Sequence, residues 1–193
     1  MAQKQPKEIR VDSIITAAME EFLDKGYEGA SVNAIAQRAG VSKGGFYHHF
    51  ANKEVLLMEA NQKLSEPIIA MAEKAYCNSS AFKGLSDYIE EYLEYWLHRP
   101  KELSFFFLSM SKSFESEILM EYYREYMKAS TEFFVGLFQK AVLLGEADIA
   151  DPEAYGVTLM GALDGVLTYA MLHPELDINT LVDRVKKIWI NER

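Results

Sequence analysis

Apolar residues recur along most of the chain at the spacing of an α-helix, and no convincing stretch shows the alternation that indicates a β-strand. The first such stretch covers residues 9–25 and stops at Gly26, because glycine readily takes the left-handed conformation found after helix ends. Its apolar positions are Ile14, Ile15, Ala18, Met19, Phe22 and Leu23. The pattern predicts an all-α protein that begins with a scaffold helix.

Two short helices with a glycine between them are predicted within residues 31–53. Ser31 is a good N-cap, and the apolar face behind it runs to about Arg38. Gly40 can end this helix, and Ser42 repeats the N-cap signal for a second one. Two short helices joined by a tight turn form a helix-turn-helix, whose second helix is suited to a DNA major groove.

The residue types on the second helix agree with that interpretation. Lys43 lies on its first turn, where side chains reach base edges, and Gly44 and Gly45 remove side chains that would hold the backbone away from the bases. Donors of the kind that bind phosphate oxygens follow, namely Tyr47, His48, His49 and Lys53, while Phe46 and Phe50 are spaced to face the core. We therefore expect this helix to bind DNA.

The remaining chain reads as further helices separated by short connections. From a predicted cap at Asn52 a long helix crosses Pro67, and Pro100 and Pro174 bound later helices. The predicted stretches are 86–98, 103–114, 115–144, 151–172 and 180–190. The expected organisation is a DNA-binding domain over residues 1–54 and a second helical domain over residues 55–193.

The helix-turn-helix stretch resembles the N-terminal signature of the tetracycline-repressor (TetR) family of bacterial transcriptional regulators. The resemblance covers about residues 9 to 57 and is carried by Gly26-Tyr27, Ser31-Val32, Ile35-Ala36, Ala39-Gly40-Val41-Ser42, Gly44, Tyr47, His49-Phe50 and Lys53-Glu54. It implies that Asn33, Lys43, Gly44 and Gly45 face bases, and that Ser31, Ser42, Tyr47, His49 and Lys53 face backbone phosphates. It also implies a homodimer with a C-terminal helical ligand domain.

A dimer interface is expected on the helix over residues 155–172, which is apolar on nearly every side and must therefore be covered on more than one side. Small residues would let a second helix approach closely, and pairing with the final helix across a two-fold axis would form a four-helix interface. The expected interface residues are Gly161, Gly165, Leu181, Val185, Ile188 and Trp189.

An effector pocket is expected in the C-terminal domain, because aromatic and methionine side chains there suit an apolar or aromatic small molecule. The candidates are Tyr88, Tyr92, Trp96, Phe106, Met110, Phe114, Tyr123, Met127 and Phe134. The same spacing also describes ordinary core. Asp164 is a carboxylate within an apolar helix, either a structural partner at the interface, which we favour, or a recognition point for a polar or cationic ligand group.

Charge and cysteine content narrow the functional class. The net charge of −9 argues against a general nucleic-acid coat protein. Residues 1–53 hold seven Lys or Arg against six Asp or Glu, whereas the other 140 residues hold 13 against 23. The single cysteine, Cys77, excludes an intrachain disulfide and fits a reducing cytosol. No signal peptide and no unbroken run of 18 apolar residues is evident, so we expect a cytoplasmic protein without a membrane span.

An enzyme and an adaptor are the competing classes. Glu94 and His98 are spaced to share a helix face and could hold a metal, but no Glu-x-x-His pair, nucleophile elbow or phosphate-binding glycine loop accompanies them. The same helix-turn-helix could also bind a protein partner. The sequence favours a ligand-responsive regulator, most simply a repressor, that binds a near-palindromic double-stranded operator as a dimer, with no catalytic residue, metal or cofactor.

Overall fold

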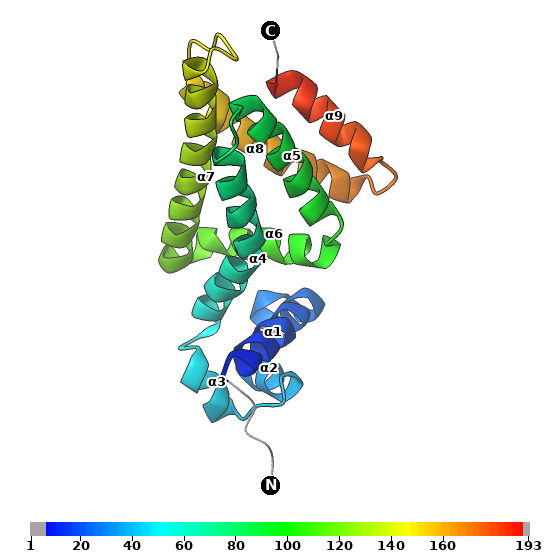
Figure 1. Cartoon of the computed structure of the whole chain (residues 1–193). Coiled ribbons are helices and arrows are strands. Elements are labelled where there is room, and N and C mark those ends of the chain that lie inside the picture. The colour runs from blue at the N-terminus through cyan, green and yellow to red at the C-terminus, as the bar shows by residue number, and fades with distance from the viewer. Residues whose placement is uncertain (1–6, 191–193) are drawn as a thin grey trace. The chain divides into compact units, whose positions relative to one another are not determined.

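The structure, a computed structural model, describes the backbone of residues 7–190 and the side chains of residues 10–190. All regular structure in that range is helical, in agreement with the predicted all-α class (Figure 1). The helices are α1 (Lys7–Gly29), α2 (Val32–Arg38), α3 (Lys43–His49), α4 (Lys53–Tyr76), α5 (Ala81–Leu97), α6 (Pro100–Lys112), the 3-10 turn η1 (Ser113–Glu115), α7 (Glu117–Leu143), α8 (Pro152–Leu172) and α9 (Ile178–Trp189).

The chain forms two compact units that do not follow the single expected boundary after residue 54. Unit 1 comprises Met1–Leu64 together with Lys101–Tyr122, and unit 2 comprises Ser65–Pro100 together with Tyr123–Arg193. The division falls inside α4, close to Pro67, the proline that the helix contains. The helix-turn-helix therefore belongs to a larger unit than its sequence signature indicates.

The core of unit 1 is built from the apolar faces that the helical spacing predicts. Every helix of the unit contributes to it. α2 and α3 are only seven residues long and have little stability of their own, so they depend on this core. Its buried members include Ile14, Ala18 and Phe22 of α1, Ile35 and Ala36 of α2, Phe46 and Phe50 around α3, Leu56, Leu57 and Ala60 of α4, Phe105 of α6 and Leu119 of α7.

The segment 101–122 is part of unit 1 through both apolar and polar contacts. The ring of Phe105 stacks on that of Phe22 with centroids 6.2 Å apart, and the amide of the buried Asn61 donates a 2.6 Å hydrogen bond to the hydroxyl of Ser109. Phe106, Met110 and Phe114 were expected in the effector pocket of the C-terminal domain, yet all three lie in this segment. Phe114 is 80% exposed.

Unit 2 is organised around α5, which packs against α8 and α9. The buried face of α5 carries Tyr88, Ile89, Tyr92, Leu93 and Trp96. α5 begins at Ala81, earlier than the predicted residue 86, because the Ser80 hydroxyl caps it by accepting a 3.0 Å bond from the backbone N–H of Lys83. The capping serine precedes the apolar stripe by which the helix was recognised.

Charged side chains close both ends of the turn between α4 and α5. The ammonium of Lys140 donates to the carbonyls of Tyr76 and Asn78 at 2.7 and 2.6 Å, where α4 ends. The carboxylate of Glu146 accepts from the backbone N–H groups of Ala81 and Phe82 at 3.1 and 2.8 Å, where α5 starts. A cation at a helix C-terminus and an anion at a helix N-terminus both match the helix dipole, so these contacts stabilise the turn.

α8 begins as predicted, with Asp151 as its N-cap and Pro152 in its first turn. By length and composition α8 is apolar enough to cross a membrane, but core helices of non-membrane proteins can have the same length and composition. Only 33% of its most apolar 18-residue stretch is buried. The side chains of Val157, Tyr169 and Leu172 are 52, 53 and 74% exposed. In a single chain α8 therefore presents an uncovered apolar face.

The crossing of α4 and α5 depends on Gly84, and we expect Gly84→Ala to destabilise the chain. A Cβ atom at this position would lie 2.2 Å from the carbonyl oxygen of Ala75. Overpacking of this kind costs about 1–3 kcal/mol, more than the roughly 1 kcal/mol that Gly→Ala contributes in a helix. Urea unfolding followed by circular dichroism measures the change. Ser86→Ala on the same helix is the control and should change stability by less than about 0.5 kcal/mol; an equal effect would refute the close contact.

Candidate nucleic-acid interface

Serine caps fix the starts of both helices of the helix-turn-helix, as the sequence predicts. The hydroxyl oxygen of Ser31 accepts a 3.1 Å hydrogen bond from the backbone N–H of Ala34, and that of Ser42 accepts a 3.0 Å bond from the N–H of Gly45. Each hydroxyl keeps its own O–H, which can donate to a phosphate oxygen. The caps and the expected phosphate contacts are therefore compatible.

The turn between α2 and α3 is a Schellman motif centred on Gly40. This residue has φ of 67°, a left-handed conformation that strongly favours glycine. The N–H of Val41 bonds to the carbonyl of Ala36 at 2.9 Å, and the N–H of Gly40 bonds to that of Gln37 at 3.1 Å. This geometry sets the angle at which α3 leaves α2.

α3 divides cleanly into a core face and an exposed face. Phe46 is fully buried, whereas Lys43, Gly44 and Tyr47 are exposed, Tyr47 with 49% of its surface accessible. Gly45 allows the helix to pack against its own cap, since a Cβ there would lie 3.3 Å from the hydroxyl oxygen of Ser42. The exposed face thus gathers the residues expected to reach bases and phosphates, together with His48 and a half-buried His49.

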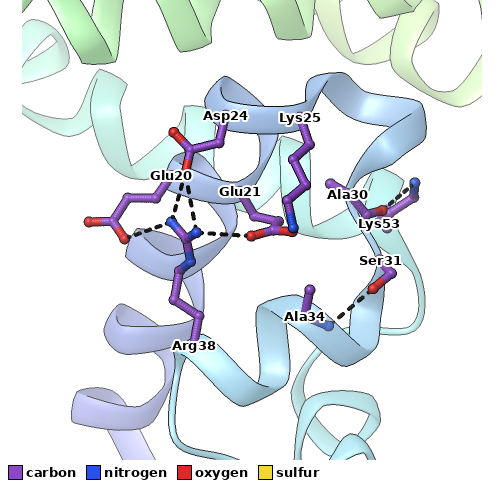
Figure 2. Close-up of polar contacts among 9 residues, drawn as sticks. All are labelled: Glu20, Glu21, Asp24, Lys25, Ala30, Ser31, Ala34, Arg38 and Lys53. Carbon is purple, nitrogen blue, oxygen red and sulfur yellow. Dashed lines mark hydrogen bonds and ion pairs between the residues drawn. The ribbon is translucent and has the colours of Figure 1, made fainter.

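Arg38 joins α2 to α1 through a carboxylate cluster that the sequence reading did not identify (Figure 2). Its guanidinium lies 3.1 to 3.2 Å from carboxylate oxygens of Glu20, Glu21 and Asp24. The side chain of Glu21 is only 2% exposed. Its other carboxylate oxygen, Oε1, forms an ion pair with the ammonium of Lys25 at 2.8 Å, although the geometry is not that of a hydrogen bond. No local pattern could reveal this network, because its partners lie up to 18 residues apart in the chain.

Lys53 is expected at a phosphate, and in the structure its ammonium has two protein acceptors. It donates to the carbonyl oxygens of Tyr27 at 2.8 Å and Ala30 at 3.0 Å (Figure 2 shows the second bond). The same ammonium lies 4.4 Å from the centroid of the Tyr27 ring, a cation–π distance. Burial, followed by the charges of Glu54 and Glu28, raises the pKa of Tyr27 to about 12, so its hydroxyl stays protonated.

These contacts leave little free positive charge at the expected DNA face. The four basic side chains over residues 25–53 are Lys25, Arg38, Lys43 and Lys53. Among the side chains that the structure describes, Lys43 alone of these four has no acidic or carbonyl partner; Lys25 and Arg38 pair with carboxylates and Lys53 with carbonyls. The electrostatic contribution to binding is therefore expected to come from few groups.

The aromatic residues expected around an effector form a closely packed group in unit 2. Tyr88 stacks on Tyr92 at 5.6 Å between ring centroids and contacts Phe133 and Phe134 of α7 at 4.9 and 5.5 Å. Trp96 and Tyr123 are also buried, and Met127 is half-buried. These expected pocket residues are thus brought into one unit, which Phe106, Met110 and Phe114 do not share.

Asp164 of α8 adds a carboxylate beside this aromatic group. Its Oδ1 is buried and has no hydrogen-bond partner among the residues described. Burial raises the pKa of Asp164 to about 6. Burial also raises the pKa values of Tyr88 and Tyr92, with smaller contributions from Tyr126 and then from Asp164.

Glu94 and His98, the pair considered for a metal-dependent enzyme, line an open depression of about 510 Å³ together with Leu176, Asp177, Ile178 and Asn179. One ring nitrogen of His98 lies 2.8 Å from the backbone carbonyl of Glu94, in contact with its own helix. Across residues 10–190, the structure contains no cluster of three or more His, Cys, Asp or Glu side chains arranged to hold a metal ion.

The expected dimer residues fall into two groups. Gly161, Gly165 and Ile188 are exposed, and a Cβ atom on either glycine would meet nothing within 4 Å. Leu181 and Val185 are buried within unit 2. Trp189 is half-buried, with its ring 5.9 Å from that of Tyr155. The open surface is therefore the stripe of α8 that contains the glycines, with Ile188 as the exposed apolar residue of α9.

We expect Arg38→Met to loosen α2, because it removes one of the two cations that face the buried carboxylate of Glu21. The double variant Glu21→Gln/Arg38→Met should recover much of the loss, since it removes the uncompensated charge as well. Amide hydrogen exchange over residues 32–38 and thermal unfolding by circular dichroism report the two effects. Equal losses in both variants would show that the buried charge is not the reason.

We expect Asp164→Asn to stabilise the folded chain near neutral pH. The pKa of Asp164 is raised from 3.8 to about 6 in the folded chain, so its contribution to stability is present below the unfolded-state pKa and is lost as pH rises through about 6. The melting temperatures of wild type and variant should coincide at about pH 4 and separate by about pH 7, with the variant higher. A lower melting temperature for the variant near neutral pH would mean that the carboxylate has a cationic or donor partner.

Comparison with known proteins places this geometry in a family. Residues 14–60 match the family model of bacterial regulatory proteins, tetR family. The Transposon Tn10 TetC protein of Escherichia coli is 33% identical over 91 residues, which cover 47% of this chain and 46% of that protein. The match thus spans less than half the length of that relative.

Solved structures extend the similarity to nearly the whole fold. A putative transcriptional regulator from Pseudomonas aeruginosa PAO1 has a TM-score of 0.84 and 25% identity, covering 97% of this chain and 91% of the other. The regulator FadR from Bacillus subtilis, solved in complex with stearoyl-CoA, has a TM-score of 0.77 and 22% identity, covering 93% and 97%. The helix-turn-helix over residues 14–60 thus matches the tetR family of bacterial regulatory proteins, and the fold of nearly the whole chain is similar to that of a putative transcriptional regulator.

Proposed function

We propose that this protein is a ligand-responsive transcriptional regulator, most simply a repressor, that acts in the cytoplasm and binds a near-palindromic operator as a homodimer. The observation that carries this proposal is the exposed face of α3, where Lys43, Gly44 and Tyr47 lie opposite the buried Phe46. The match of residues 14–60 to a regulatory family supports it. In this proposal Lys43 and the backbone at Gly44 and Gly45 approach base edges, with Asn33 of α2 beside them.

Phosphate contacts are assigned to neutral donors for the most part. The hydroxyls of Ser31 and Ser42 retain their O–H after capping, and Tyr47 and His49 offer further donors on α3. Few ammonium groups are free at this surface, so hydrogen bonds and shape complementarity must supply much of the specificity. Two α3 helices about 34 to 36 Å apart would then enter successive major grooves of one operator.

The uncovered stripe of α8 supports dimerisation. Gly161 and Gly165 leave room for another helix to approach, and the apolar side chains of Val157, Tyr169 and Leu172 are largely exposed in a single chain. A second copy of the chain placed on this stripe would bury them and form a four-helix interface with α9.

The effector is assigned to the aromatic interior of unit 2, around Tyr88, Tyr92, Trp96 and Phe134. The FadR neighbour was solved in complex with stearoyl-CoA, whose long acyl chain is apolar, and this supports the assignment. The ligand of this chain is proposed only as an apolar or aromatic small molecule. It would favour a conformer with misplaced recognition helices, and it can do so only through its different affinity for the two conformers.

An adaptor that binds protein through the same fold is the competing function, and a metal-dependent enzyme using Glu94 and His98 is less well supported by the geometry described above. The adaptor proposal would gain support if the exposed residues of α3 had no effect on nucleic-acid binding.

Fluorescence anisotropy on DNA from directly upstream of the gene, against a scrambled duplex at several salt concentrations, tests the proposal. We expect a preference of about a thousandfold or more at two chains per site. Lys43→Ala should relax the sequence preference, because Lys43 is an exposed cation on the first turn of α3, where side chains reach base edges. The matched control Lys83→Ala, on α5 of unit 2, should leave DNA binding unchanged. Absence of binding by the wild type to any duplex at low salt would overturn the DNA assignment and favour the adaptor.

A further inference from the structure

Asp164 of α8 carries a buried carboxylate oxygen that no neighbouring group satisfies. Its Oδ1 atom accepts no hydrogen bond from the residues described. The hydroxyl of Thr168, one turn further along α8, donates its single hydrogen to the backbone carbonyl of Asp164 at 2.9 Å instead. A buried carboxylate without a partner costs stability, so its presence within an apolar helix calls for a function.

Lysines of the helices around α5 are committed to other acceptors. Lys74 of α4 and Lys186 of α9 form ion pairs with Glu91 and Glu90 of α5. The ammonium of Lys140, on α7, donates to two carbonyl oxygens at the end of α4. Burial is the only cause that raises the pKa of the α8 carboxylate, so its counter-ion is not among the residues that the structure describes.

The direction of the carboxylate also argues against a partner in a second copy of the chain. The stripe of α8 proposed for dimerisation contains Gly161 and Gly165, which are exposed in a single chain. An atom directed toward that stripe would be exposed as well, whereas Oδ1 of Asp164 is already buried in the single chain. Its neighbours Leu163 and Leu167 belong to the buried face of α8. Oδ1 therefore faces the interior of unit 2, which speaks against the interface role that the sequence favours.

Aromatic rings of α5 and α7 add a second feature that attracts cations. α5 packs against α8. On α5, the rings of Tyr88 and Tyr92 stack with centroids 5.6 Å apart, and Phe133 of α7 lies 4.9 Å from Tyr88. Burial first, and the charge of Asp164 among smaller causes, raise the pKa values of both phenols, so they stay neutral. The faces of neutral aromatic rings attract cations, and so does a carboxylate, so both features favour an ammonium-type group.

We propose that the effector of this protein carries a cationic, ammonium-type group, which the buried carboxylate of Asp164 binds while the rings of Tyr88 and Tyr92 contact the apolar or aromatic remainder. This inference rests on the proposed ligand-responsive function and narrows its ligand class. The cation supplies the partner that the carboxylate lacks in the protein alone.

The first experiment measures charge preference in the full chain, using three probes with the same phenylalkyl body. Phenylbutylamine is a cation, phenylbutanol is neutral and phenylbutyrate is an anion at a pH of about 7.5, where Asp164 is ionised. Isothermal titration calorimetry gives the affinity of each. We expect the amine to bind at least about tenfold more tightly than the alcohol, because a hydrogen bond to a buried charge contributes at least that factor. The anion should bind most weakly.

The variant Asp164→Asn removes the charge and keeps the size of the side chain. It should bring the affinities for the amine and the alcohol to within about threefold of each other, because the amide offers no net charge to the ammonium. Asp183→Asn, at an exposed position of α9, is the matched control and should keep the wild-type preference.

Other results would overturn the inference. One is an amine that binds wild type no more tightly than the alcohol, or not at all. Another is a preference for the amine that persists in Asp164→Asn. A third is a lower melting temperature of Asp164→Asn together with weaker self-association in analytical ultracentrifugation, because this would give the carboxylate a protein partner across the interface.

Fluorescence anisotropy on the duplex that wild type prefers reports separately on the proposed function. Release of the duplex by the amine from wild type, but not from Asp164→Asn, would support both the function and the cation site. If the amine bound through Asp164 while wild type bound no DNA, the proposed regulatory function would fail and the cation site would stand. DNA binding without any preference for the amine would overturn the cation site alone.

Discussion

The short length of α2 and α3 is the constraint on which the rest of unit 1 depends. Helices of seven residues are too short to persist in water, so their orientation must be imposed from outside. The core supplies part of this through Ile35 and Phe46, and the Schellman turn at Gly40 fixes the angle between them. Charged side chains supply the rest, with Arg38 tying α2 to α1 and Lys53 tying the end of α1 to α4.

Features that depend on neighbouring residues could be predicted from the sequence. The caps Ser31, Ser42 and Asp151 and the glycine breaks at Gly26 and Gly40 all lie where local spacing placed them, because each acts on backbone groups within a few residues. The all-α class and the resemblance of residues 14–60 to the tetR family followed from the same local patterns.

Features that depend on distant partners could not be predicted in this way. The two carbonyl acceptors of Lys53 are one case, because nothing near this residue in the chain shows that Tyr27 and Ala30 lie within its reach. The aromatic stretch over residues 103–114 shows helical spacing, but spacing does not say which partner covers a face. Phe105 packs in the core of unit 1, and Phe114 stays largely exposed, so aromatic content alone was a poor guide to a pocket.

The pairing of basic residues within unit 1 has a consequence for how a regulator of this kind would find its site. Retention on arbitrary DNA depends almost wholly on cations that displace counterions, and α3 offers mainly Lys43 for this among the side chains described. The 140 residues after residue 53 carry 13 basic against 23 acidic side chains and are repelled by the polymer. Such a protein would slide over short distances only and would rely on repeated encounters from solution. Its occupancy of a specific site would then follow the concentration of free protein closely, because few molecules would be bound non-specifically elsewhere on the DNA.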